Sequence, residues 1–501
     1  MIIRFHNLGK IKETTLDLRP LTVIIGPNNS NKTYIAYSIY GLWQAQRTPS
    51  GAFVEVINSA FKNAENNILK IPIDQVLWEH FQANSNRVCE QFVDDLSSYF
   101  QDSSGRLFAG TQLHLALSFD DFAATLSHLV PQEIDSLGWL LDMRTKGDVI
   151  EVVCNPSYEG RMTGAEAPNE GALSFSAFMA TRHLLSSVIQ GLLFPHPFLL
   201  PAERNAFVIT YKMLANRRYK ALRESVRQAF GSRASAERQL DLLREGGEVR
   251  YPQPVEDFLD FLTDVEAAKP PNTRSPFAKL ADTIESSIQD TNRTRYRSTA
   301  LGGKEIITQV EKGLDIDLYN ASSSIKQLAP LLLYLRYRAK ENDLLIIDEP
   351  EMNLHPESQA KLLEVLAMLV NHGVNVLLTT HSPYLMAHLN NLAQADDTSQ
   401  AVRNRQAKSL YLKHPDSLLR MDQVSAYEMK DNQLQSLKDP DYGIRWDTLS
   451  DVSADLQQRY FAIYEEGHAK ERARNGRKAA AQKNGQKERQ PAGGQDGPDQ
   501  P

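Results

Sequence analysis

The chain has 501 residues, 42% of them apolar, with 55 Lys and Arg against 62 Asp and Glu and a formal net charge of −7. This negative balance excludes a protein that coats nucleic acid over its whole surface. The two cysteines, Cys89 and Cys154, support neither a disulfide framework nor a cysteine-based zinc site. The apolar runs are far shorter than the roughly 20 residues that cross a bilayer. We therefore expect a cytoplasmic protein of several structural units, with no membrane contact.

The N-terminal part, residues 1–45, has the pattern of a strand, a loop and a helix. Residues 21–25 are a short β-branched run, and residues 34–43 have apolar side chains at helical spacing. The loop between them reads Gly26-Pro27-Asn28-Asn29-Ser30-Asn31-Lys32-Thr33. This is close to the phosphate-binding pattern Gly-x-x-x-x-Gly-Lys-Ser/Thr, although an ordinary strand–turn–helix remains the alternative.

The chemistry of such a loop depends on its backbone and on two side chains. Backbone N–H groups at the helix start would surround phosphate oxygens, Lys32 would reach the β- and γ-phosphates of ATP, and the Thr33 hydroxyl would ligate Mg²⁺. Asn31 stands where the pattern has glycine. Because Asn tolerates a positive φ better than most residues, the loop can still form.

The next two regions differ in character from the first. Residues 46–195 are predicted as an inserted helical and β region, with a helix over 58–100 and strands over 113–117 and 149–153. Residues 196–299 contain the segment Pro201-Ala202-Glu203-Arg204 and then a helical arm. The arm, residues 212–250, has ten Lys and Arg against five acidic residues. It is either a solvated helix face or a contact for nucleic acid.

Residues 300–400 have a second α/β pattern. We predict helices over 325–340 and 357–370, and buried strands over 344–347 and 374–378. Uninterrupted apolar strands that alternate with helices are typical of a parallel sheet covered on both faces.

Polar residues follow both of these strands. Asp348 and Glu349 come directly after the first strand, and His381 follows the second. Asp348 would hold Mg²⁺, and Glu349 would orient and deprotonate an attacking water. His381 would hydrogen-bond the γ-phosphate. The alternatives are solvated acids at a surface strand end and a structural histidine.

Three serines, Ser322, Ser323 and Ser324, open the helix before the acidic strand. A capping box from Ser324 to Gln327 explains them structurally. The functional alternative is that this helix start offers N–H groups, hydroxyls and a positive dipole end to a phosphate.

The C-terminal part divides in two. Residues 401–466 are predicted as an α/β extension. Residues 467–501 have eight Lys and Arg, four acidic residues and no apolar periodicity. We therefore predict a disordered basic tail there.

The loop, the serine-rich helix start, the acidic strand end and His381 occur in the order found in the ABC-type ATPase heads of RecF, OLD and SMC-like proteins. The chain resembles that family over residues 1–45 and 300–390. The resemblance implies an α/β P-loop ATPase head with a parallel sheet core and a large, mostly helical insertion. It equates residues 320–324 with the signature motif, residues 351–355 with the D-loop and His381 with the switch histidine.

In this family two heads sandwich ATP. The resemblance therefore implies a homodimer or higher oligomer in which Ser323 or Ser324 faces the γ-phosphate held by the partner subunit's Lys32. Ser324 stands where the subgroup often has glycine. The segment ending in Arg204 also resembles a motif of stand-alone ATPases in Septu- or PARIS-type anti-phage defence, which pair with a separate nuclease. That likeness implies a slow ATPase that switches an effector, with Arg204 near the nucleotide or in a fold-stabilising ion pair.

Other classes of protein fit less well. A self-contained nuclease of the OLD type would need a further catalytic domain, and only 120 residues follow His381. A DNA-repair machine of the SMC type would carry long heptad arms or a CxxC hook. A transport ATPase would keep its motifs closer together. A scaffold that binds ATP without hydrolysing it stays open, because Asn31 and Ser324 depart from the family pattern.

Overall fold

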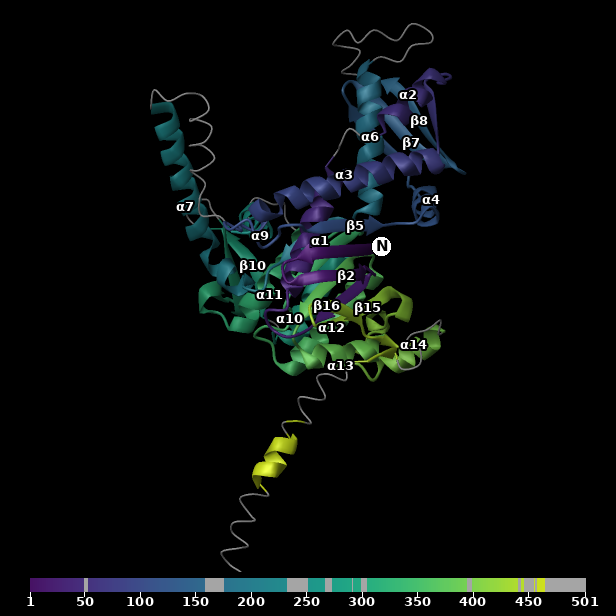
Figure 1. Ribbon diagram of the computed structural model, residues 1–501. Helices are drawn as coiled ribbons and strands as arrows, with labels where there is room; N and C mark the ends of the chain where they lie inside the picture. Colours follow the sequence, from purple (N-terminus) through teal and green to yellow (C-terminus); the bar gives the residue numbers. More distant parts are fainter. Residues whose placement is uncertain are drawn as a thin grey trace, which may run out of the picture. The chain divides into compact units, whose positions relative to one another are not determined.

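The computed structural model describes residues 1–48, 53–157, 175–231, 251–265, 273–290, 292–298, 304–393, 399–439, 443–445, 455 and 457–464. The chain divides into two units, Met1–Ile444 and Arg445–Pro501. The labelled strands and helices of Figure 1 belong to the first unit. In the second unit residues 457–464 are helical.

A six-stranded sheet forms the core of the first unit, in the order β16-β15-β3-β14-β13-β9. Its strands are β3 (Leu21–Ile25), β9 (His196–Leu200), β13 (Asp343–Asp348), β14 (Asn375–Thr380), β15 (Val424–Lys430) and β16 (Gln433–Ser436). Neighbouring strands are parallel, except for the antiparallel pair β15 and β16. Every residue of β3 and β13 is buried, so both faces of the sheet are covered there. The predicted α/β fold with a parallel sheet core is confirmed.

Helices from distant parts of the chain pack on this sheet. Helix α1 (Lys32–Arg47) contacts β9, β13 and β14, and α12 (Pro356–Asn371) contacts β14. The other helices near the core are α7 (Arg204–Gly231), α9 (Gln253–Asp264), α10 (Pro276–Ile288), α11 (Ser323–Tyr337), α13 (Pro383–Leu392) and α14 (Gln400–Ala407). The helices and strands predicted within residues 300–400 are confirmed, with ends that differ by a few residues.

Smaller antiparallel sheets complete the first unit. One has the order β2-β1-β5 and joins the N-terminus to the inserted region, another has the order β10-β11-β12, and β17 pairs with β18. Their strands are β1 (Ile2–Leu8), β2 (Ile11–Asp17), β5 (Gln112–Ala116), β10 (Arg293–Ser298), β11 (Lys304–Glu311), β12 (Leu314–Asp317), β17 (Lys438–Asp439) and β18 (Gly443–Ile444). The predicted strand at 113–117 is confirmed as β5.

The described part of the inserted region contains a four-stranded sheet, β4-β8-β7-β6, together with four helices. Its elements are α2 (Val54–Lys62), β4 (Ile68–Pro72), α3 (Gln75–Tyr99), α4 (Phe119–Ser127), β6 (Gln132–Ser136), β7 (Trp139–Lys146), β8 (Val149–Pro156) and α6 (Phe175–Leu193). Residues 58–100, predicted as helical, are helical in α2 and α3, but the prediction is wrong between them, where β4 separates the two helices. Leu69 and Ile71 of β4 are buried and Lys70 between them is exposed, which is the period of two that a strand requires.

The two basic segments lie largely outside the described residues. Helix α7 includes the start of the predicted arm. Residues 232–250 are not described, and neither are most side chains in the C-terminal half of α7. The tail, residues 467–501, is not described either. Within the described part of the chain, no helix combines the length and the apolar character needed to cross a membrane.

Candidate functional site

The loop after β3 holds its shape through two left-handed asparagines and one close contact of a glycine. Asn29 and Asn31 have left-handed φ values of 60° and 68°, so Asn31 adopts the conformation for which the pattern uses glycine. Gly26 lies against β15, where an added Cβ would come within 2.8 Å of Met429 Cβ. Only glycine fits at that contact, and the loop therefore depends on β15 for its position.

Lys32 points its ammonium group back into this loop. Lys32 Nζ donates to the carbonyl oxygens of Gly26 at 3.0 Å and Pro27 at 2.9 Å, and to Ser30 Oγ at 3.3 Å. Its side chain is buried, which lowers the pKa of Lys32 to about 8, although the carboxylates of Glu349 and Asp348 oppose the shift. Lys32 is thus still mainly charged at neutral pH.

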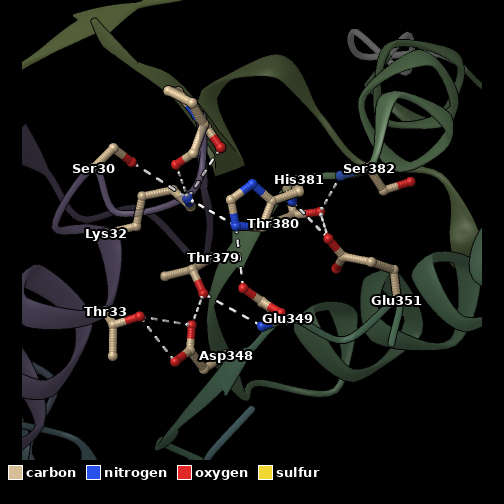
Figure 2. Close-up of polar contacts among 12 residues, drawn as sticks. Ser30, Lys32, Thr33, Asp348, Glu349, Glu351, Thr379, Thr380, His381 and Ser382 are labelled. Carbon is tan, nitrogen blue, oxygen red and sulfur yellow. Dashed lines mark hydrogen bonds and ion pairs between the residues drawn. The ribbon is translucent and has the colours of Figure 1, made fainter. Parts of the chain in front are cut away.

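Asp348 and Thr33 meet although they are 315 residues apart in sequence (Figure 2). Thr33 Oγ1 donates to Asp348 Oδ2 at 3.1 Å, and Thr379 Oγ1 donates to the other carboxylate oxygen. Burial raises the pKa of Asp348 to about 6, while the hydrogen bonds from Thr379 and Thr33 oppose the shift. At neutral pH this is a carboxylate beside a hydroxyl, an oxygen donor set that suits Mg²⁺.

Glu349 and His381 face Lys32 from the ends of β13 and β14. His381 Nε2 lies 3.1 Å from Glu349 Oε1 and 3.1 Å from Lys32 Nζ. A single ring nitrogen makes one of these hydrogen bonds at a time: it accepts from Lys32 when unprotonated and donates to Glu349 when protonated. Burial lowers the pKa of His381, helped by Lys32, and burial raises the pKa of Glu349, helped by Glu351. His381 can therefore exchange partners when a proton moves.

Glu351 joins the segments that follow β13 and β14. Its Oε1 accepts from the backbone N–H of His381 at 2.6 Å and from Thr380 Oγ1 at 2.7 Å. This carboxylate therefore fixes the backbone that carries the His381 ring. Sequence reasoning placed Glu351 only in the D-loop by resemblance, and it did not single out Thr379 or Thr380. The two threonines that follow the apolar residues 376–378 at the end of this strand were the available signal.

Arg204 lies behind the acidic residues. It is 2% exposed, and its guanidinium donates to the carbonyl oxygens of Asp348 at 2.8 Å and Glu349 at 3.2 Å. It also donates to the carbonyl oxygens of Pro201 and Gln327, and the side-chain amide of Gln327 faces it as well. The N–H groups of its guanidinium thus donate to buried groups of the protein. The structure places Arg204 as a support for the Asp348–Glu349 backbone, where Glu349 has a left-handed φ of 50°.

The serine-rich helix start differs from the capping box expected at Ser324. The N-cap of α11 is Ser322, whose Oγ accepts from the N–H of Ile325 at 3.4 Å and lies 2.9 Å from Ser324 Oγ. The helix begins earlier than expected because Ser322 has the extended backbone that an N-cap requires. Among the described residues, no hydrogen bond joins these serines to the cluster around Lys32. The structure thus assembles the loop, both acids and His381, and leaves Ser322, Ser323 and Ser324 apart.

A metal at this site would have one carboxylate and one hydroxyl from the protein. In the described ranges, no group of three or more His, Cys, Asp or Glu side chains is arranged to hold a metal ion. A cation bound by Asp348 and Thr33 would therefore complete its shell with water or phosphate oxygens. Mg²⁺ favours this arrangement, because it retains several waters and is usually bound through one or two carboxylates together with substrate phosphates.

Comparison with solved structures finds SMC head domains. One, from Pyrococcus furiosus, has an extended coiled coil and is bound to the C-terminal domain of ScpA; it is 11% identical, covers 91% of this chain and 98% of its own, and has a TM-score of 0.32. Another, bound to the C-winged helix domain of ScpA, is 12% identical, covers 87% and 96%, and has a TM-score of 0.32. The head domain from Thermotoga maritima is 10% identical, covers 87% and 97%, and has a TM-score of 0.27. Values of this size do not establish a common fold.

Comparison by sequence gives one family match. No curated protein matches the chain. Residues 208–387 match the family model described as "AAA domain, putative AbiEii toxin, Type IV TA system". This stretch includes Asp348, Glu349 and His381 but begins after the loop of Lys32 and Thr33. The part of the chain that supplies the acidic residues and the histidine is therefore similar to an AAA domain.

Proposed function

We propose that this protein is a Mg²⁺-dependent ATPase that acts as a nucleotide-controlled switch. The observation that carries the proposal is the contact between Thr33 and Asp348, 3.1 Å apart across 315 residues of sequence. A lysine, a hydroxyl and two carboxylates around one strand edge are the groups that phosphoryl transfer to water uses. The match of residues 208–387 to an AAA domain supports the same reaction.

Each residue then has a defined task. Lys32 and the N–H groups of residues 26–33 would bind the phosphates, and Thr33 and Asp348 would hold Mg²⁺, which would neutralise charge on the phosphate oxygens. Glu349 would orient the attacking water and accept its proton. His381, held by Glu351, would exchange its contact with Lys32 for one with the γ-phosphate. Arg204 would act as a positioning residue.

The wider role is also a proposal. Two copies would sandwich ATP, with Ser322, Ser323 and Ser324 of one copy completing the site of the other. ATP binding would close this homodimer or larger oligomer, and hydrolysis would reopen it. A separate effector, a nuclease, would read the change in cytoplasmic anti-phage defence. The basic arm, residues 212–250, would contact nucleic acid.

Binding and assembly test this function. Titration with ATP and Mg²⁺ should show binding by the wild type and a loss of affinity of about 10²-fold in Lys32→Ala, because the buried ammonium contacts the phosphates directly. Lys12→Ala removes an exposed lysine of β2 and should bind as the wild type does. Light scattering should show a larger species with ATP than without it. Equal ATP binding by Lys32→Ala would refute the assignment of the loop.

A pull-down of the native complex with ATP, followed by mass spectrometry, tests the effector. A nuclease recovered with ATP and lost without it supports the switch. An ATP-binding protein that shows no phosphate release in a sensitive assay is instead the non-hydrolysing scaffold.

A further inference from the structure

A cavity lies at the opposite edge of the central sheet, where the strands begin. It has a volume of about 510 Å³, and its lining includes His196 of β9 and Asp343 of β13, which are partners in the sheet. The candidate nucleotide site lies where the parallel strands end. The two sites are thus at different edges of the same sheet.

Basic side chains from four segments line this cavity. They are Arg47 at the end of α1, His196 at the start of β9, Arg338 at the C-cap of α11, and Lys340 in the following loop. Arg338 and Lys340 are exposed, and neither side chain has a hydrogen bond or an ion pair with any residue that the structure describes. The pKa of His196 is lowered, first by burial and then by the three neighbouring cations. The lining therefore carries an excess of basic groups, with Arg47, Arg338 and Lys340 against the two carboxyl groups of Glu341 and Asp343.

The acidic groups of the cavity do not neutralise these cations directly. Asp343 Oδ2 accepts from the Tyr334 hydroxyl at 2.9 Å and from the backbone N–H of Lys340 at 2.9 Å. Burial raises the pKa of Asp343, while its two hydrogen bonds and the nearby charges of Lys340 and Arg338 oppose the shift. Glu341 is exposed to solvent at the rim. Neither carboxyl group makes an ion pair with Arg338 or Lys340 in the part of the chain that the structure describes, so both side chains can still contact a ligand.

Helix C-termini also face this edge, and their negative ends would otherwise repel an anion. The end of α6 is satisfied by the protein itself: Arg47 Nη1 donates to the Phe194 carbonyl oxygen at 2.6 Å, and Asn342 Nδ2 donates to that of Gly191 at 3.2 Å. At the end of α11, the N–H groups of residues 338 and 339 donate to one carbonyl oxygen. The helix ends at the cavity are therefore partly compensated before any ligand binds.

We propose that this cavity binds a small phosphorylated anion, no larger than a mononucleotide, whose phosphate contacts Arg338 and Lys340. The volume falls within the range of small-molecule pockets, roughly 300–1,000 Å³. A guanidinium binds phosphate oxygens in a bidentate manner, and an ammonium adds a point charge. Tyr337, half-buried in the lining, would contact the rest of the ligand. A nucleic-acid strand fits less well, because it requires an extended basic groove.

Pyrophosphate is the probe, measured by titration calorimetry at low ionic strength. A Lys32→Ala background weakens phosphate binding at the loop. In this background we expect pyrophosphate to bind at one site, the cavity. Its affinity should fall at least about tenfold when Arg338→Ala and Lys340→Ala are added. The matched control is the pair Lys70→Ala and Arg106→Ala, which removes an exposed lysine and an exposed arginine of the inserted region and should leave the affinity unchanged.

The fold should be retained in Arg338→Ala and Lys340→Ala, because substitutions of exposed residues that make no hydrogen bond or ion pair alter stability little. In the wild-type background, the same double substitution should remove one of two pyrophosphate sites, so the cavity can be tested even if Lys32→Ala is unstable. Equal affinity in the cavity variant and the control would overturn the proposal. The proposal would also be overturned if single-stranded DNA bound at Arg338 and Lys340 more tightly than pyrophosphate does. The outcome is independent of ATP hydrolysis, which is measured separately.

Discussion

The charged residues at the two edges of the central sheet, where the parallel strands end and where they begin, differ in burial and in their contacts with the protein. At the carboxyl edge, Lys32, Asp348 and His381 are buried or half-buried and already have partners in the protein. At the amino edge, Arg338 and Lys340 are exposed and, among the described residues, unpaired. A ligand at the first edge must replace existing contacts, whereas a ligand at the second edge adds new ones.

From this difference we expect substitutions at the two edges to have different effects on turnover, stability and ligand binding. A preassembled, buried site links chemistry to folding, so its residues should affect turnover, stability and pH dependence together. An open basic cavity should affect only the binding of its own ligand. Helix α1 begins at the first edge with Lys32 and ends at the second with Arg47, so the comparison includes the two ends of one helix.

The largest effect is expected for Glu349→Gln. The amide keeps the shape of the side chain but cannot accept a proton, so turnover should fall by about 10²–10³ while ATP binding is retained. Phosphate release at saturating ATP, together with the KM, measures this. Glu357→Gln, an exposed acid on α12, serves as the matched control and should turn over normally. A raised KM with unchanged kcat would mean that Glu349 only binds substrate.

A smaller but still large effect is expected for Arg204→Ala. The change leaves the buried carbonyl groups of Asp348, Glu349 and Gln327 without their donor, which should cost at least about 3 kcal/mol of unfolding free energy. Urea unfolding measures it. Arg204→Lys restores one charge but not the planar fork, and should recover only part of the loss. An Arg204→Ala protein as stable as the wild type would contradict the supporting role.

The smallest effect is a pH dependence of Mg²⁺ affinity. Asp348 binds a metal only as a carboxylate, and its pKa of about 6 lies above the ordinary value because of burial. Protons therefore compete with Mg²⁺ below about pH 6, where the affinity should fall about tenfold per pH unit, and not above pH 7. Calorimetry at pH 5, 6 and 7 tests this. The stability contribution has the opposite sign: protonated Asp348 stabilises the metal-free fold at low pH, and this is lost as the pH rises through about 6.

In Asp348→Asn the dependence should disappear together with most of the affinity. A wild-type affinity that is flat between pH 5 and pH 7 would place the metal elsewhere.

Local patterns in the sequence were sufficient for the elements that carry these residues. The apolar run before Asp348 and the loop from Gly26 to Thr33 predicted a parallel sheet with phosphate chemistry at one edge, and the structure brings both segments to that edge. Such patterns work because the requirements of a buried strand and of a phosphate loop lie within a few residues.

The remaining contacts depend on residues far apart in the chain. Nothing near Arg204 predicts that its guanidinium reaches the carbonyl groups of Asp348 and Glu349, because that contact requires β9 to lie beside β13. Thr379 was overlooked for the same reason, since its hydroxyl matters only beside Asp348. The strand β4 was missed within a predicted helix because five residues give too short a sample of its period.

The place of β3 between β14 and β15 has a consequence for synthesis on the ribosome. β3 leaves the ribosome well before the two strands that flank it, because β14 ends at Thr380 and β15 at Lys430, about 355 and 405 residues after Ile25. At about 5–20 residues per second, β3 waits roughly 20–80 s for its second neighbour. During that time the backbone of this apolar strand is unpaired and can form hydrogen bonds with other chains. The nascent chain should therefore depend on chaperones that shield β3.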